Sequence, residues 1–277
     1  MNQSRYPLLI DGAALQSVLD DHDILVIDLS RPPVHMQQHI PGAINLDIGG
    51  LMASQPPVMG LLPEIRYLEG LLGSLGVSTD THIVAYDEEA NAKACRLLWT
   101  LDCLGHRNAS LLDGGLQAWA AEGRPLSTET PAITPTDYHA STEAAVIADN
   151  AYIQARLGDL QIVDVRTPAE YEGVDKRALR AGHIPGAVNI EWTQAIDRDR
   201  QMRLLPLDEL RRIYQDAGLD PSRETVVHCQ THQRSAHSYF VLKLLGFAHL
   251  RGYPGSWSDW GNDPETPIET GPATRTS

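Results

Sequence analysis

The sequence predicts an α/β protein made of two similar copies, each a mostly parallel sheet with helices on both faces. Two observations support this prediction. The same order of sequence features occurs twice along the 277 residues. Within each copy, short β-branched runs alternate with helical stretches, which is the pattern of parallel strands joined by helices. A chain of this length is also typical of about two domains.

The repeat is visible in segments that match in order. "VID" ending at Asp28 corresponds to "IVD" ending at Asp164, and a His-Ile-Pro-Gly-Ala turn follows at 39–43 and at 183–187. Further pairs keep the same order: "LLP" at 61–63 and 204–206, Gly76 and Gly218, and "LLDGGLQAW" at 111–119 with "GYPGSWSDW" at 252–260. Chance similarity does not preserve order in this way, so we infer an internal duplication.

Both copies are expected to fold through the same elements. The first should have strands at 24–28, 44–46 and 82–87 and helices at 68–77, 93–105 and 114–123; the second should have strands at 160–165, 188–190 and 225–229 and helices at 208–219, 235–246 and 255–263. Between them lies a run rich in Pro, Ser and Thr, which is linker composition. We therefore predict an N-terminal domain at 1–125, a linker at 126–145 and a C-terminal domain at 146–277.

Charge and hydropathy exclude several classes of partner. The formal net charge is −14, so the chain would on average repel the phosphate backbone, and we expect no nucleic-acid partner. No apolar run approaches the roughly 18 to 20 residues of a membrane helix, and no membrane partner is expected. The N-terminus lacks a secretory pattern, which favours the cytoplasm.

The three cysteines do not form a disulfide framework, because their number is odd and no Cys-x-x-Cys occurs. Cys95 and Cys103 lie in a helical stretch, and we expect them to be small buried side chains. The histidines show no repeated metal-ligand spacing, so no metal site is predicted. Cys229 differs from the other two, because it ends a short apolar strand.

The segment "HCQTHQRS" at 228–235 has the features of an anion-binding loop. Ligands of parallel sheets bind at the carboxyl ends of the strands, where Cys229 is expected to lie. Loop amides that curl before a helix, together with the helix N-terminus, hold negative charge. Such a loop lowers the pKa of a cysteine, and Arg234 adds a planar fork of donors.

Two chemistries use a loop of this kind. Cysteine phosphatases have five residues between the cysteine and the arginine, and they need a general acid, for which Asp259 is the candidate. Here four residues separate Cys229 from Arg234: Gln230, Thr231, His232 and Gln233. The tighter ring suits a single outer sulfur atom better than a tetrahedral phosphate. Sulfur transfer is therefore favoured, and the phosphatase or arsenate-reductase alternative stays open.

The chain resembles the tandem-domain rhodaneses, which are thiosulfate sulfurtransferases. The resemblance covers roughly residues 5–265 and rests on the duplication, the two "HIPGA" turns, the strands "VIDLSR" and "IVDVRTPAEY", the helices "DGGLQAW" and "GSWSDW", and the six-residue loop. The loop resembles a bacterial subgroup with Cys-Gln-Thr-His-x-Arg. It departs from the Cys-Arg-Lys-Gly-Val-Thr and Cys-Gly-Ser/Thr-Gly-Val-Thr loops of the thiosulfate and mercaptopyruvate types.

The resemblance implies two rhodanese-like domains of which only the C-terminal one is active, since Asp87 stands in the first copy where Cys229 stands in the second. It implies a persulfide on Cys229, aided by Arg234, with thiosulfate as the small anionic donor and cyanide or a thiol as the acceptor. The residues expected to bind substrate are Gln230, Thr231, His232, Gln233, Ser235 and Trp192. No cofactor and no metal are implied, Arg166 is expected to be structural, and a tandem chain that pairs its own copies is expected to be monomeric. A 3-mercaptopyruvate sulfurtransferase and a non-enzymatic persulfide carrier remain alternatives.

Overall fold

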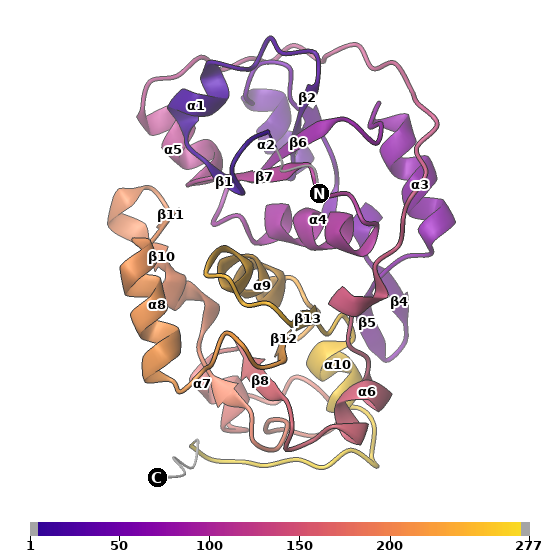
Figure 1. Ribbon diagram of the computed structural model, residues 1–277, viewed down its shortest axis with the longest axis vertical. Coiled ribbons are helices and arrows are strands. Elements are labelled where there is room, and N and C mark those ends of the chain that lie inside the picture. The colour runs from indigo at the N-terminus through magenta and orange to yellow at the C-terminus, as the bar shows by residue number, and fades with distance from the viewer. Residues whose placement is uncertain (1–4, 273–277) are drawn as a thin grey trace. The chain divides into compact units, whose positions relative to one another are not determined.

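The computed structural model describes residues 5–272, which divide into two compact units (Figure 1). Unit 1 comprises the described residues up to Leu51 together with Pro63–Glu143 and Ile196–Leu204. Unit 2 comprises Met52–Leu62, Ala144–Ala195 and the described residues from Leu205 onward. Each unit thus contains one short stretch of chain that belongs, by sequence, to the other repeat.

Unit 1 is built around a five-stranded sheet in the order β1-β7-β6-β2-β3, in which all neighbours are parallel. Its strands are β1 (Leu9–Ile10), β2 (Ile24–Asp28), β3 (Ile44–Asn45), β6 (His82–Tyr86) and β7 (Ala109–Leu112). Its helices are α1 (Gly12–Gln16), α2 (Pro32–Gln37), α3 (Ile65–Ser74), α4 (Ala92–Cys103) and α5 (Gly115–Ala121), with the 3₁₀ turn η1 (Ile48–Leu51). The hairpin of β10 (Ile196–Asp197) and β11 (Arg203–Leu204), joined by η4 (Arg198–Arg200), completes the unit.

The alternation of side chains along the strands of unit 1 explains why helices cover both faces. Val84 packs in one buried cluster with Leu15 of α1 and Trp119 of α5. Its neighbours Ile83 and Ala85 must point to the opposite face, where α4 packs against β6 and β7. Cys95 and Cys103 are buried on α4, as expected, and burial raises the pKa of both thiols.

Unit 2 is built around a four-stranded parallel sheet in the order β13-β12-β8-β9. Its strands are β8 (Gln161–Asp164), β9 (Val188–Asn189), β12 (Thr225–His228) and β13 (Leu250–Gly252). Its helices are α6 (Asn150–Ala155), α7 (Pro168–Tyr171), α8 (Leu207–Asp216), α9 (Arg234–Leu244) and α10 (Ser256–Trp260), with the 3₁₀ turns η2 (Ala144–Val146) and η3 (Trp192–Ala195). The hairpin of β4 (Ala53–Gln55) and β5 (Val58–Leu61), from the first repeat, belongs to this unit.

The core of unit 2 repeats the arrangement of unit 1. Ile162 and Val226 pack with Tyr253, Trp257 and Trp260 in one buried cluster. On the other face, α9 packs against β12 and β13. The predicted fold class, two α/β copies with mostly parallel sheets, is therefore confirmed.

The run that was predicted as a linker, 126–145, follows the surface of unit 1 by backbone hydrogen bonds. Ser127 pairs with His39, Thr136 N–H donates to Gly73 O, and Ser141 N–H donates to the carbonyl of Leu104. The ranges 1–125 and 146–277 stay the predicted extents of the two domains. Within residues 5–272, every helix is too short or too polar to cross a bilayer.

Candidate active site

Cys229 lies directly after β12, at the carboxyl end of a strand that runs between β8 and β13. The loop from Gln230 to Gln233 then leads into α9, which begins at Arg234. His232 has a φ of 54°, a left-handed conformation that curls the loop back toward its own start. The Cys229 side chain is buried within this curl, with 1% of its surface exposed.

The start of α10 holds the outer side of the loop. Cys229 N–H donates to Ser256 Oγ at 3.2 Å, and Trp257 N–H donates to the carbonyl of Cys229 at 3.0 Å. Ser258 N–H donates in the same way to Gln230 O at 3.0 Å. Because these loop carbonyls face α10, the amides that follow are free to face the inside of the curl.

The inside of the curl gathers hydrogen-bond donors around the sulfur atom. Ser235 Oγ donates to Cys229 Sγ at 3.4 Å, and Ser235 Oγ is itself held 2.7 Å from His232 Nδ1. The backbone amides of Thr231 and Ser235 and the side chain of Arg234 also bond to the sulfur. Burial alone would raise the pKa of the Cys229 thiol, but the Arg234 charge and these donors hold the pKa below its ordinary value.

Arg234 is fixed from its other side by a carboxylate on α7. Its Nη1 lies 2.7 Å from Glu170 Oε2 and its Nη2 lies 2.9 Å from Glu170 Oε1, a two-point pair. Burial alone would raise the pKa of Glu170, but Arg234 holds it below its usual range. The arrangement follows from the sheet, because α7 begins just beyond β8, the parallel neighbour of β12.

A fully buried polar cluster lies at the ends of the same two strands. Arg166 bonds the carboxylate of Asp164 at 3.0 and 2.6 Å, and its guanidinium stacks 4.4 Å above the ring of Trp257. His228 Nε2 lies 3.6 Å from Asp164, and burial lowers the pKa of His228, so its ring is neutral at pH 7. These contacts are internal to the unit and fit the structural part expected of Arg166.

In unit 1 the equivalent loop encloses a carboxylate in place of a thiol. Asp87 Oδ1 accepts from Glu89 N–H at 2.8 Å and Asn91 N–H at 2.9 Å. Asp87 Oδ2 accepts from Lys93 N–H at 3.0 Å and Ala94 N–H at 3.3 Å. The first copy thus holds the Asp87 carboxyl group within the curl, where burial raises its pKa, and it has no thiol there.

Comparison with known proteins gives the same duplication. The rhodanese-like domain matches the chain twice, at residues 12–122 and 149–263. The chain belongs to the rhodanese family. Each match covers one of the two copies inferred from the repeat, so both the first copy, with Asp87, and the second copy, with Cys229, are rhodanese-like domains.

Three relatives are similar over nearly the whole chain. A thiosulfate sulfurtransferase of Pseudomonas aeruginosa is 40% identical over 268 residues, 96% of this chain and 98% of the relative. A sulfur carrier protein, TtuD, of Thermus thermophilus is 37% identical over 289 residues, 98% of this chain and 99% of the relative. The crystal structure of SseA, a 3-mercaptopyruvate sulfotransferase of Escherichia coli, has a TM-score of 0.81 at 26% identity, covering 91% of this chain and 99% of that chain.

The structure brings most of the predicted site residues together in this rhodanese-like domain. Thr231 and Ser235 face the sulfur through their amides, and His232 is buried behind Ser235. Gln230 is partly buried, and its Nε2 donates to the carbonyl of Arg177 at 3.1 Å.

Two predicted residues lie at the edges of the loop. Gln233 is the N-cap position of α9 and makes no side-chain cap bond. Trp192 lies on η3, where its ring meets His237 of α9 edge-on at 5.3 Å. Asp259, the candidate general acid, accepts from the Tyr253 hydroxyl at 2.7 Å, which is a structural contact within the end of the domain.

Sequence reasoning missed three residues that shape the site. Glu170 had a local signal, because Thr167-x-x-Glu170 is a capping box at the end of a parallel strand. Ser256, which accepts from the Cys229 amide, had none that we recognise. Gly60 belongs to the first repeat, and only the fold brings its backbone against Thr231.

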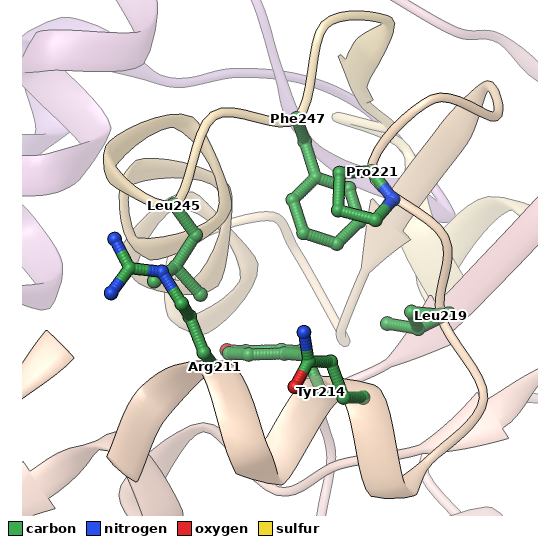
Figure 2. A pocket seen from close by; sticks show the side chains of 7 residues that line it. Arg211, Tyr214, Leu219, Pro221, Leu245 and Phe247 are labelled. Carbon is green, nitrogen blue, oxygen red and sulfur yellow. The ribbon is translucent and has the colours of Figure 1, made fainter. Parts of the chain in front are cut away.

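A further pocket in unit 2 lies away from the Cys229 loop. Figure 2 shows Phe247, Pro221 and Leu219 around a hollow of about 170 Å³ beside Tyr214 of α8. Its lining includes no residue of the loop and is largely apolar. We assign it no part in the candidate site.

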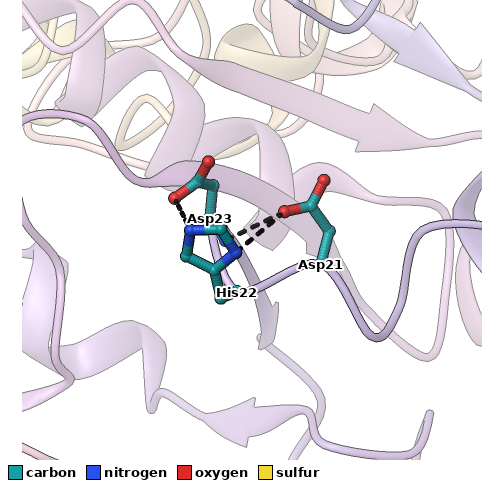
Figure 3. A group of neighbouring side chains, drawn as sticks. All are labelled: Asp21, His22 and Asp23. Atoms are coloured by element: carbon teal, nitrogen blue, oxygen red, sulfur yellow. Dashed lines mark hydrogen bonds and ion pairs between the residues drawn. The ribbon is translucent and has the colours of Figure 1, made fainter.

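A group in unit 1 brings Asp21, His22 and Asp23 close enough to hold a metal ion (Figure 3). Arg5 already pairs with Asp21 at 2.9 Å and with Asp23 at 3.7 Å. His22 is almost fully exposed. Exposed acidic groups with their own counter-charge are common without a metal, so these contacts do not argue for a metal site.

Proposed function

We propose that the protein is a thiosulfate sulfurtransferase in which Cys229 carries the sulfur atom as a persulfide. The observation that carries the proposal is a buried thiol of lowered pKa, enclosed by inward amides, Ser235 and Arg234. The thiosulfate sulfurtransferase of P. aeruginosa, at 40% identity, supports the same activity. The same donors can stabilise the negative charge of the Cys229 thiolate and, after sulfur transfer, the negative charge of the persulfide.

The first step is attack by the Cys229 thiolate on the outer sulfur of thiosulfate. A new S–S bond forms, the bond between the two sulfur atoms of thiosulfate breaks, and sulfite leaves with the electron pair. Arg234 would attract the dianion and steady the charge that shifts toward sulfite. The amides of Thr231 and Ser235 would then face the persulfide sulfur.

The second step returns the enzyme to its first state. Cyanide, or a thiolate of the cell, attacks the outer sulfur of the persulfide and forms a bond to it. The persulfide S–S bond breaks, and its electron pair returns to Cys229 as a thiolate. No net oxidation occurs over the cycle, and no cofactor is needed.

Mass spectrometry of the intact protein tests this proposal. After mixing with thiosulfate alone, the protein should gain one sulfur atom, and cyanide should remove it with release of thiocyanate. Cys229→Ser should gain nothing, whereas Cys103→Ala, a change at a thiol buried on α4, should behave as the parent does. A Cys229→Ser protein with full thiocyanate production would refute the mechanism.

A second candidate donor is 3-mercaptopyruvate, which the name of the E. coli relative suggests. We favour thiosulfate because the loop presents Arg234 and has neither the glycine nor the Val-Thr of the mercaptopyruvate type. The two donors can be compared in the same experiment. Sulfur gain with mercaptopyruvate and none with thiosulfate would reassign the donor, and the proposed persulfide on Cys229 would still hold.

A sulfur carrier that serves another protein is a third candidate, supported by the relative from T. thermophilus. Such a carrier would take sulfur from thiosulfate but release it slowly to cyanide. Turnover that keeps pace with persulfide formation would favour the enzyme. A persulfide stable against millimolar cyanide would favour the carrier.

We also propose that the protein works as a monomer in the cytoplasm. All three cysteines are free thiols, and a reducing compartment keeps thiols in that state. Sedimentation equilibrium should give the mass of one chain, and fractionation of the source cells should recover the protein with cytoplasmic enzymes. A dimer mass would contradict the proposed monomer, and recovery outside the cytoplasm would contradict the proposed location.

A further inference from the structure

Arg234 needs an external anchor if it is to stay beside the sulfur. It stands at the first position of α9, where a cation faces the positive end of the helix dipole. About a quarter of its side chain is exposed to solvent, at 26%. A long, flexible side chain in that setting gains rotamer freedom by turning toward water.

Glu170 supplies that anchor and is itself held firmly. It is 4% exposed, and its own amide donates to Thr167 Oγ1 at 3.2 Å while its Oε2 accepts from Thr167 N–H at 3.1 Å. This capping box closes the first turn of α7. The carboxylate therefore presents both oxygens to Arg234 from a fixed position.

The contacts connect the start of α7 to the thiol of Cys229. Thr167 fixes Glu170, Glu170 grips the guanidinium at two points, and Arg234 bonds to Cys229 Sγ. A two-point pair fixes orientation as well as distance. Glu170 does not contact the sulfur in any bond described, so any effect it has on the chemistry passes through Arg234.

We propose that Glu170 is a positioning residue that holds Arg234 against the sulfur of Cys229 for the reaction with an anionic sulfur donor. The proposal rests on the proposed function for its reaction, and on the contacts above for its geometry. It assigns the start of α7, which sequence reasoning left without a function, to the active site.

Glu170 has two opposing effects on the site. It fixes Arg234, which favours the thiolate, and it partly neutralises the arginine charge, which disfavours it. About a quarter of the Arg234 side chain is already exposed to solvent, and a guanidinium that turned further into water would be screened from the sulfur. Positioning should therefore outweigh neutralisation, and removal of Glu170 should raise the pKa of Cys229.

A double-mutant cycle separates positioning from a general structural effect. Glu170→Ala should lower kcat/KM for thiosulfate by on the order of 10- to 100-fold, and Arg234→Ala should lower it at least as much. In the Arg234→Ala protein, the additional change Glu170→Ala should cost almost nothing, because the anchored group is gone. Additive losses would overturn the proposal.

The pH dependence of alkylation gives a second readout that needs no sulfur donor. Iodoacetamide modifies the Cys229 thiolate, and the midpoint of its pH profile should move upward in Glu170→Ala and less so in Glu170→Gln. Glutamine keeps the side-chain length and one accepting oxygen, so it should recover part of the activity. An unmoved midpoint, or one that moves downward, would refute positioning even if the alanine variant is unstable.

Glu224 is a matched control in the same unit. It pairs with Arg251 at 2.5 Å and Arg156 at 2.6 Å, at the opposite end of β12 from Cys229. Glu224→Gln should leave both the alkylation midpoint and kcat/KM unchanged. If the parent protein takes no sulfur from thiosulfate, the proposed function fails, while the alkylation profiles still decide whether Glu170 positions Arg234.

Discussion

The backbone of Gly60 lies against the carbonyl of Thr231, so closely that a methyl group on Gly60 would stand 2.3 Å from the carbonyl oxygen. Gly60 is part of β5, in the hairpin that the first repeat contributes to unit 2. Met59 N–H donates to Ser258 Oγ at 2.9 Å, and Ser258 Oγ lies 3.0 Å from the carbonyl of Met59. The first repeat therefore supplies a strand that contacts the loop of Cys229.

Replacing Gly60 with alanine should lower sulfur transfer by about tenfold or more, because Thr231 would have to shift and carry its amide away from the sulfur. A 2.3 Å approach to backbone cannot be relieved by a rotamer change. Steady-state thiocyanate formation measures the effect, and urea unfolding measures the accompanying loss of stability. Activity equal to that of the parent would mean that the hairpin does not influence the loop.

Gly186 provides the control for strain at a positive φ. Its φ of 74° is close to the 78° of Gly60, yet a methyl group there would meet no atom within 4 Å. Gly186→Ala should cost about 1 kcal/mol of stability and leave the activity of the folded protein unchanged. A comparable loss of activity in both variants would point to backbone strain rather than to contact with Thr231.

The rate of persulfide formation should rise with pH, and the midpoint of the rise should lie below pH 9.0, the ordinary pKa of a thiol. Burial raises the pKa of Cys229, but Arg234, Ser235 and the loop amides together lower it by more than burial raises it. The reactive thiolate is therefore already abundant where a free cysteine would be mostly protonated. Stopped-flow mixing with thiosulfate measures the profile.

Ser235→Ala tests whether the Ser235 hydroxyl helps to lower the pKa of Cys229. It removes the hydroxyl donor at 3.4 Å from the sulfur and leaves Arg234 in place, so the profile should move upward in pH and keep its plateau. A profile that stays in place would show that the hydroxyl does not stabilise the thiolate.

The repeat made the fold predictable because its signals are local. Strand β2 was expected at 24–28 and is found at Ile24–Asp28, since a buried parallel strand needs only a short β-branched run between turns. Cys229 was expected at the carboxyl end of a parallel strand, where ligands of such sheets bind, and it directly follows β12. Both inferences need no knowledge of distant contacts.

The parts that the sequence did not reveal depend on contacts between distant segments. The exchange of hairpins between the units depends on where 52–62 and 196–204 pack, and a repeat alignment carries no such information. Gly60 looks like an ordinary turn glycine until Thr231 is placed beside it. Glu170 lies between these cases, because its capping box is local but its pairing with Arg234 needs the order of β8 and β12.

A one-residue insertion in the loop should shift its preference from sulfur toward phosphate. A glycine inserted between Gln233 and Arg234 gives the five-residue spacing of cysteine phosphatases and widens the ring of amides. Sulfur gain from thiosulfate should fall, and hydrolysis of p-nitrophenyl phosphate should appear, since its leaving group needs no general acid. A glycine inserted after Gly158, an exposed turn position, is the control and should change neither activity.

Asp87 should be the main polar determinant of stability in the first copy's loop. Asp87→Ala would leave four backbone amides without their acceptor, which should cost about 2 kcal/mol or more of unfolding free energy. The emptied curl would then resemble the inside of the Cys229 loop, so sulfate or thiosulfate should bind there and recover stability in proportion to RT ln(1 + [L]/Kd).

Asp11→Ala is the control, because it removes a cap that serves one amide, that of Ala14. It should cost about 1 kcal/mol of unfolding free energy, with no recovery by anions. Equal responses of the two variants to sulfate would mean that Asp87 does not occupy an anion-binding curl.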